Sequence, residues 1–460
     1  MKRRRRDFLR DMAAAAAAVA AWAAPAAGQL AIPPRMTPKG PKAAPLPPAA
    51  VPAVGVLPAP SENKGRAGTY EAKTSHAGYN YHVYVPKGYG DAAPAGLHLF
   101  FHGQGGGKGA PHFGQWSKHF LEPCNLIGIN MQYTDGDNAK DTGGKVDAAV
   151  EALRQVMADY KIVAGRGAVG SFSGGGLPHE RLLAKFGKVP LGSPSPCPFN
   201  HSSLYGSNYW ADPTGCATMS WFVGVGTKEW NMGMPTLGTS QTKRAEQLLQ
   251  AALRGGPADV HFKVTKDKGH TIGDADVRDS AALFARSQLA FAPFLYEPDY
   301  AAPALAGVAR QANTLALGRA SAAIEKALAD PKLDAAAKPA AEDLKAKIGG
   351  RIDAALAMTR QLVTDDVLLA VYYGNLLAQQ LGTHAKAADL KAAVAEARKS
   401  PAYTAHSQAF AEFVSKFRNL FQGAGLASGA EPFLESLKTR AAATSLLGKM
   451  AAEILTMGGP

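Results

Sequence analysis

Residues 169–176 read VGSFSGGG, in which Ser173 stands among glycines at the end of an apolar run. A nucleophilic serine on a sharp strand-to-helix turn needs small residues two positions before and after it, because larger side chains would clash there. Ser171 and Gly175 meet this need, although glycine is the usual residue at the first of these positions. The helical sequence LPHERLLAKF follows. The stretch predicts a nucleophile elbow, and the alternative is a flexible glycine loop.

Segments typical of strands and helices alternate around this turn, between residues 67 and 294. Short β-rich runs predict strands, and apolar residues at helical spacing predict helices. The expected strands are 79–86, 96–103, 125–133, 165–173 and 218–227, with a last strand and its loop at 259–270. The expected helices include 146–160, 240–254 and 276–295. This alternation predicts the α/β class, with a mostly parallel sheet covered by helices on both faces.

The remainder of the chain, 298–460, is alanine-rich and predicts helices throughout. One helix is expected to begin at Thr364 as its N-cap. Another carries an apolar stripe of Phe410, Phe413, Val414, Phe417 and Phe421. We expect an all-α domain, TPR-like but without a strict repeat, that has its own core and docks a protein partner. A fragment from Ser61 to Pro298 is then expected to fold and act alone.

The N-terminus predicts export. Residues 3–11 read RRRRDFLRD, which resembles the twin-arginine signal, and the alanine-rich stretch 12–24 that follows is too short to span a bilayer. We expect a signal at 1–28, a Pro/Ala-rich linker at 29–64 and a catalytic domain at 65–297, in a periplasmic or extracellular protein.

Cysteine use and charge fit such a protein. Cys197 and Cys216 are expected to form a disulfide that closes a surface loop, which leaves Cys124 as a small buried hydrophobe; three free thiols are the alternative. The net charge is +13, part of it in the N-terminal signal. No basic run is interleaved with aromatic residues, so we expect no nucleic-acid partner.

A second motif precedes the elbow. Residues 98–107 read HLFFHGQGGG, so that His102 and Gly103 end an apolar run and Gln104 begins a glycine loop. An enzyme that cleaves esters must place N–H donors around a tetrahedral oxyanion. The expected donors are the backbone N–H groups of Gly174 and Gln104. His102 and Gly103 are expected beside the substrate, and the alternative for His102 is a core histidine.

With these motifs, residues 67–294 resemble the α/β-hydrolase fold. They look most like secreted esterases of the polyhydroxybutyrate depolymerase, feruloyl esterase and dienelactone hydrolase-like groups. The resemblance implies an acid and then a histidine after the nucleophile. KGHTIGD supplies His270, and VGVGTKEWN supplies Glu229, a glutamate where aspartate is usual. Asp274 is a rival acid and Asn231 a third choice.

Two other histidines are assigned structural places. His261 falls inside an expected strand, and His179 lies on the helix just after Ser173.

These residues predict a serine esterase. Ser173, His270 and Glu229 would cleave a carboxylic ester, small or polymeric, through an acyl-enzyme. The alternatives are a prolyl oligopeptidase-like peptidase and a non-catalytic binding protein on a hydrolase scaffold. Aromatic residues in the stretch 193–218 are expected to line the acyl pocket or to form the core of a cap: Phe199, Tyr205, Tyr209 and the substrate-binding candidate Trp210.

No metal or cofactor is implied. The acidic and histidine residues show no ligand spacing, and residues 135–141, DGDNAKD, lack the glutamate that an EF-hand loop requires.

Overall fold

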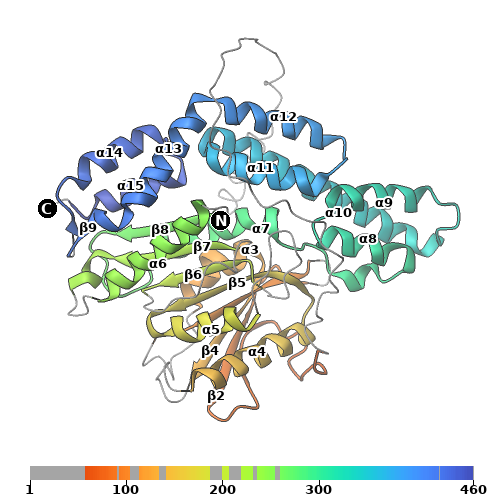
Figure 1. Ribbon diagram of the computed structural model, residues 1–460. Helices are drawn as coiled ribbons and strands as arrows, with labels where there is room; N and C mark the ends of the chain where they lie inside the picture. The colour runs from red at the N-terminus through yellow and green to blue at the C-terminus, as the bar shows by residue number, and fades with distance from the viewer. Residues whose placement is uncertain are drawn as a thin grey trace, which may run out of the picture. The chain divides into compact units, whose positions relative to one another are not determined.

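The apolar runs of the sequence form one eight-stranded sheet in the computed structural model (Figure 1). The structure describes residues 57–90, 93–103, 113–133, 141–186, 199–206, 219–231, 236–253, 259–423 and 425–458. The strands are β1 (Gly68–Lys73), β2 (Tyr79–Val85), β3 (Ala95–Phe101), β4 (Leu126–Tyr133), β5 (Ile162–Phe172), β6 (His201–Tyr205), β7 (Ser220–Gly226) and β8 (Val260–Thr265).

The strand order is β1-β2-β4-β3-β5-β6-β7-β8. β2 runs antiparallel to β1 and β4, and all the other neighbours are parallel. Parallel neighbours need crossover segments, and the helices provide them. The predicted α/β class with a mostly parallel sheet is confirmed.

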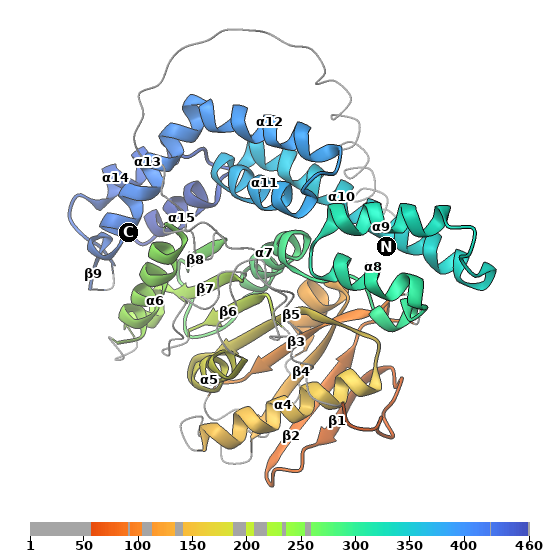
Figure 2. The same cartoon turned by 45° about the vertical axis from the view of Figure 1, so that its right-hand side comes forward.

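Helices cover both faces of the sheet. The connecting helices are α2 (Gly114–Trp116), the π-helix η2 (Ser117–Leu121), α3 (Glu122–Cys124), α4 (Thr142–Asp159), α5 (Gly176–Phe186), α6 (Thr236–Leu253) and α7 (Asp274–Phe291). Side chains alternate along β3: Leu99 and Phe101 enter the core under α4, α5 and α6, whereas Phe100 enters a second core under η2 and α7. Figure 2 shows α4 and α5 in front of the sheet.

β6 corrects the expectation for residues 193–218. His201–Tyr205 is a central parallel strand between β5 and β7, not part of an insertion or cap. Phe199 and Tyr205 are fully buried in the two cores, so they do not line an acyl pocket. Tyr209 and Trp210 lie outside the described residues.

Polar side chains of β6 are paired inside the protein. His201 is fully buried, and its Nδ1 lies 2.7 Å from Ser220 Oγ while its Nε2 lies 2.8 Å from Ser280 Oγ. Ser203 Oγ lies 2.8 Å from the same Ser280 hydroxyl. Because buried polar groups are stable only when hydrogen-bonded, these pairs let a polar sequence occupy the centre of a sheet.

The C-terminal region is helical, as predicted. Its helices are α8 (Pro303–Asn313), α9 (Leu317–Ala329), α10 (Lys338–Asp365), α11 (Val367–Leu381), α12 (Lys386–Lys399), α13 (Pro401–Lys416), α14 (Ala430–Arg440) and α15 (Leu446–Leu455), with a short hairpin of β9 (Phe421–Gln422) and β10 (Gly425–Leu426). Helices α8 to α12 enclose an apolar core of their own. Thr364 is not an N-cap, since α10 runs on to Asp365; Asp366 caps α11 by accepting from the Leu369 N–H.

Helices α13 to α15 instead share the core of the sheet, contrary to the expectation of a separate helical core. Both views place them beside α6 and β8. The ring of Phe417, from the predicted stripe, packs edge-on against Phe262 of β8 with centroids 5.4 Å apart. His261 of β8 pairs with Glu453 of α15, Nε2 to Oε2, at 2.9 Å, which confirms a structural place for His261. The boundary at residue 298 stays a prediction.

Several expectations concern residues outside the described ranges. The signal, most of the linker, Cys197 and Cys216 are among them. Cys124 is a half-buried free thiol, and burial raises its pKa to about 12. In the described parts of the chain, no helix is both long and apolar enough to cross a membrane.

Candidate active site

The elbow at Ser173 has the predicted strand, turn and helix. β5 ends at Phe172, a 3₁₀ turn covers Ser173–Gly175, which includes Gly174, and α5 begins at Gly176. Ser173 has φ +51°, in the left-handed region that non-glycine residues rarely occupy. A Cβ at Gly175 would collide with the backbone carbonyls that end β3. Such strain is typical of a functional position, because the surrounding structure must maintain it.

Ser171 shows why serine can replace the usual glycine in this elbow. Its Oγ lies 2.9 Å from Nδ1 of His179, and Nε2 of His179 lies 3.1 Å from Ser202 Oγ. All three side chains are fully buried. Burial lowers the pKa of His179 to about 3, so its ring is neutral and can donate at one nitrogen and accept at the other. His179 is therefore structural, as expected, and it ties β5, α5 and β6 together beneath the turn.

Glu229 and His270 are in contact. Glu229 lies in the 3₁₀ helix Thr227–Asn231 directly after β7, and its side chain is fully buried. One carboxylate oxygen accepts the backbone N–H of Gly226 at 2.9 Å, and the other lies 3.1 Å from His270 Nδ1. A carboxylate at Nδ1 fixes the tautomer that leaves Nε2 free to accept a proton.

The loop that carries His270 is attached to the end of β7. The Lys228 N–H donates to the Lys268 carbonyl at 3.0 Å, and the Asp267 N–H donates to Thr227 Oγ1 at 2.8 Å. The Lys268 ammonium pairs with the buried Asp276 of α7 at 2.6 Å. These contacts hold the loop just before His270, whose side chain remains 22% exposed.

His270 lies beside the elbow. Its ring stacks on Phe172, the residue before Ser173, with centroids 4.5 Å apart. Gly103 also borders the turn, since a Cβ there would lie 3.2 Å from Ser173 Cβ. The ends of β3 and β5 and the loop after β8 thus meet at one place.

Asp274, the rival acid, has a different partner. It lies in the first turn of α7, and its carboxylate is 2.8 Å from His119 Nε2. The hydrogen bond from His119 lowers the pKa of Asp274. The side chain of Asn231 lies outside the described residues.

The remaining site residues divide into two groups. His102 is buried and stacks near Tyr133 with its Nδ1 2.6 Å from the Gly103 carbonyl, a position that suits the core-histidine alternative. Gln104 and Trp210 lie outside the described residues. Two neighbours of His270 were not predicted from the sequence: Phe172, whose ring it contacts, and Gly206, where a Cβ would lie 2.7 Å from His270 Cε1. Gly206 directly follows β6, and the polar sequence of β6 did not predict that it would be a strand of the sheet.

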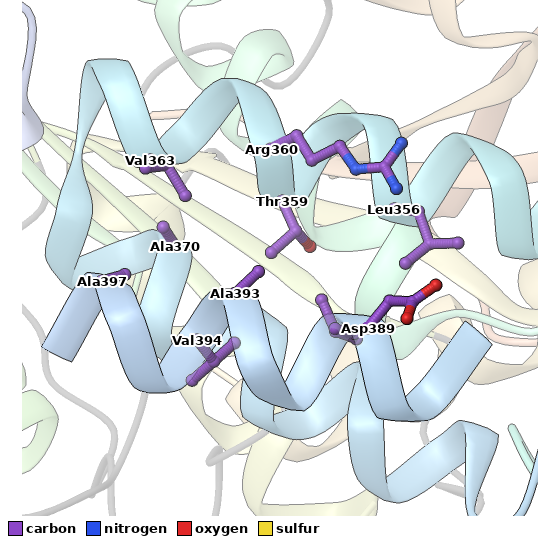
Figure 3. Close-up of a pocket in the computed structure, with 10 residues that line it drawn as sticks. Leu356, Thr359, Arg360, Val363, Ala370, Asp389, Ala393, Val394 and Ala397 are labelled. Atoms are coloured by element: carbon purple, nitrogen blue, oxygen red, sulfur yellow. The ribbon is translucent and has the colours of Figure 1, made fainter. Parts of the chain in front are cut away.

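One hollow lies elsewhere, between α10, α11 and α12 (Figure 3). Its lining is mostly apolar, with Arg360 and Asp389 contributed by different helices. None of the residues that line it is a serine or a histidine. Within the described ranges, no three His, Cys, Asp or Glu side chains gather as a metal site would require.

The strand order, crossovers and elbow define an α/β-hydrolase fold. No protein-family profile and no curated protein matches the chain. Among solved structures it is similar to a thermostable esterase (TM-score 0.33, 15% identity, 47% of this chain and 59% of that one). It is also similar to the siderophore hydrolase EstA from Aspergillus nidulans, with a TM-score of 0.35 and 12% identity over 50% of this chain and 98% of that one. A third similar structure is the esterase Est2 of Thermogutta terrifontis bound to propionate, with a TM-score of 0.32 and 15% identity over 48% of this chain and 93% of that one. The chain thus spans 59% of the first of these proteins.

Proposed function

We propose that this chain is a serine hydrolase of carboxylic esters, with Ser173 as nucleophile, His270 as general base and Glu229 as the orienting acid. The observation that carries the proposal is the buried Glu229 carboxylate, which lies 3.1 Å from His270 Nδ1. The His270 ring in turn contacts Phe172, the residue before Ser173 with its strained positive φ. If Ser173 lay only in a glycine loop, or if His270 were only a core histidine, a buried carboxylate at His270 Nδ1 beside a strained serine would have no role.

The proposed reaction has two halves. Ser173 Oγ forms a bond to the ester carbonyl carbon while its proton passes to His270 Nε2, and Glu229 stabilises the imidazolium. The oxyanion receives backbone N–H groups, which we assign to Gly174 and Gln104. The proton then moves from His270 to the departing alcohol, and the carbon–oxygen bond of the ester breaks. Water repeats these steps on the acyl-enzyme and releases the acid.

The test compares the wild-type chain with Ser173→Ala. We expect wild type to hydrolyse p-nitrophenyl butyrate and to take up a fluorophosphonate on Ser173, as mass spectrometry of the peptide would show. Ser173→Ala should lose activity by at least about 10³-fold with an unchanged circular dichroism spectrum. A folded Ser173→Ala protein with wild-type turnover would contradict the triad, and a wild type that neither turns over ester nor takes up the probe would support a binding protein.

We further propose that the protein is exported by the twin-arginine route and that Cys197 and Cys216 are joined there. The arginine pattern and the alanine-rich stretch after it support export.

A further inference from the structure

Gly206 lies at the edge of the Glu229–His270 pair. It directly follows β6, has φ +56° and donates its N–H to the Gly224 carbonyl at 3.1 Å. A Cβ built on it would be 2.7 Å from His270 Cε1 and 2.8 Å from His270 Nδ1. The same atom would be 3.1 Å from the Glu229 carboxylate. Since carbon atoms in contact are about 3.5–4.0 Å apart, no side chain fits between Gly206 and the pair.

Two other groups also contact the His270 ring. The Phe172 ring covers it with an interplanar angle of 33°, and Glu229 holds Nδ1. These neighbours come from three separate places: the end of β5, the turn after β7 and the residue after β6. The ring therefore has little room to move toward Phe172 if it is pushed from Gly206.

We propose that Gly206 is a positioning residue for His270. Its missing side chain leaves the space in which the imidazole meets the Glu229 carboxylate. This inference rests on the proposed function, because it assigns Gly206 an effect on proton transfer that acts through His270. A methyl group at position 206 would displace the ring from Glu229, and misplacing a catalytic group by about 1 Å can cost about 100-fold in rate.

Gly382 offers a matched control. It ends α11 with the same φ of +56°, and a Cβ built there meets nothing within 4 Å. An alanine at either position has the same unfavourable positive φ, and at position 382 the ψ of −107° makes the backbone no more favourable for it. Only the one at position 206 contacts the Glu229–His270 pair.

The experiment uses the full chain as wild type, Gly206→Ala and Gly382→Ala. Thermal unfolding gives the stability of each, a fluorophosphonate titration gives the active-site concentration, and initial rates with p-nitrophenyl butyrate give kcat and KM. We expect both variants to unfold at lower temperature than wild type. Gly206→Ala should lose at least about 100-fold in kcat with KM within about threefold of wild type, whereas Gly382→Ala keeps its kcat.

If Gly206→Ala does not fold, Gly206→Asn is measured beside Gly382→Asn, since asparagine takes a positive φ more often than alanine does. A folded position-206 variant that keeps its kcat overturns the inference, and so does an equal loss of kcat in the matched Gly382 variant. A wild type without turnover and without phosphonate uptake refutes the proposed function, and the inference then falls with it. Wild-type activity that Ser173→Ala abolishes leaves the function standing and lets Gly206 be judged separately.

Discussion

Two carboxylates compete in the sequence for the role of orienting acid, and their surroundings differ. Glu229 is fully buried with both oxygens engaged, one of them by His270. Asp274 is 52% exposed at its side chain and is engaged by His119. A carboxylate stabilises an imidazolium far more strongly when water is excluded, so the surroundings favour Glu229.

We therefore expect Glu229→Gln to lower kcat by about 10²–10⁴-fold, whereas Asp274→Asn changes it by less than about threefold. Each substitution removes one negative charge and keeps the shape of the side chain, so each is the control for the other. Initial rates with p-nitrophenyl butyrate at saturating substrate measure both. The opposite ranking would make Asp274 the acid.

At the residue scale, the sequence predicted the features that depend only on neighbours along the chain. The spacing around Ser173 was sufficient to predict the turn, because the clash that demands small residues is between neighbours along the chain. It left the choice between Glu229 and Asp274 open, since both follow strands and lie near His270 in sequence or in the expected fold. The partner of Asp274, His119, lies far away in the sequence, and only the folded chain brings the two together.

At the scale of elements, three buried histidines of the sheet and its helices share a strongly lowered pKa. His98 lies on β3, His179 on α5 and His201 on β6. Burial lowers the pKa of each to about 3. The rings of Trp116 and Phe120 surround His98, with centroids 4.8 Å and 5.2 Å from that of its imidazole.

These histidines predict that the protein loses stability in mild acid. Between pH 6.5 and about 3 the unfolded chain binds a proton at His98 that the folded chain does not, so the free energy of unfolding falls as pH falls. For one histidine the loss between pH 7 and pH 5 is about 2 kcal/mol. His98→Phe keeps an aromatic ring and removes the proton site.

Urea unfolding of wild type and His98→Phe at pH 7 and pH 5 measures this effect. The drop in the free energy of unfolding should be about 2 kcal/mol smaller in the variant. Equal drops in the two proteins would mean that His98 accepts a proton in the folded state, contrary to its burial among aromatic rings.

Elements with an apolar pattern were predicted and those without one were missed. β2, β4 and β7 appear where their runs of apolar residues placed them. β6 reads HSSLY, and its place in the sheet depends on Ser220 and Ser280, which hydrogen-bond to His201 from other elements. The N-cap of α11 was predicted at Thr364, but α10 continues to Asp365 and Asp366 is the cap. Both threonine and aspartate can cap a helix, so the local sequence did not decide between them.

At the scale of the whole molecule, the helical region is bound to the sheet by polar as well as apolar contacts. Asp259, just before β8, is almost fully buried and accepts from Arg286 of α7 and from the Tyr373 hydroxyl of α11, the latter at 2.7 Å. Arg351 of α10 donates to the carbonyl oxygens of Gln288 and Ala292 at the end of α7. Without the helices, the buried Asp259 would lose the hydrogen bond from the Tyr373 hydroxyl. Loss of such a partner from a buried ion pair is costly even when the pair itself persists.

We therefore expect the fragment Ser61–Pro298 to be poorly soluble or unstable, in place of the independent folding that the sequence suggested. It keeps the whole proposed triad, but β8 and α6 lose the cover of α13 to α15, including Phe417, and exposed apolar patches of this kind promote aggregation. The matched control is residues 61–458, which lack only the ends of the chain. Expression, gel filtration and ester hydrolysis of both fragments decide the matter: 61–458 should be monodisperse and as active as the full chain. A soluble Ser61–Pro298 fragment with the same kcat would show that the helices are dispensable for the sheet.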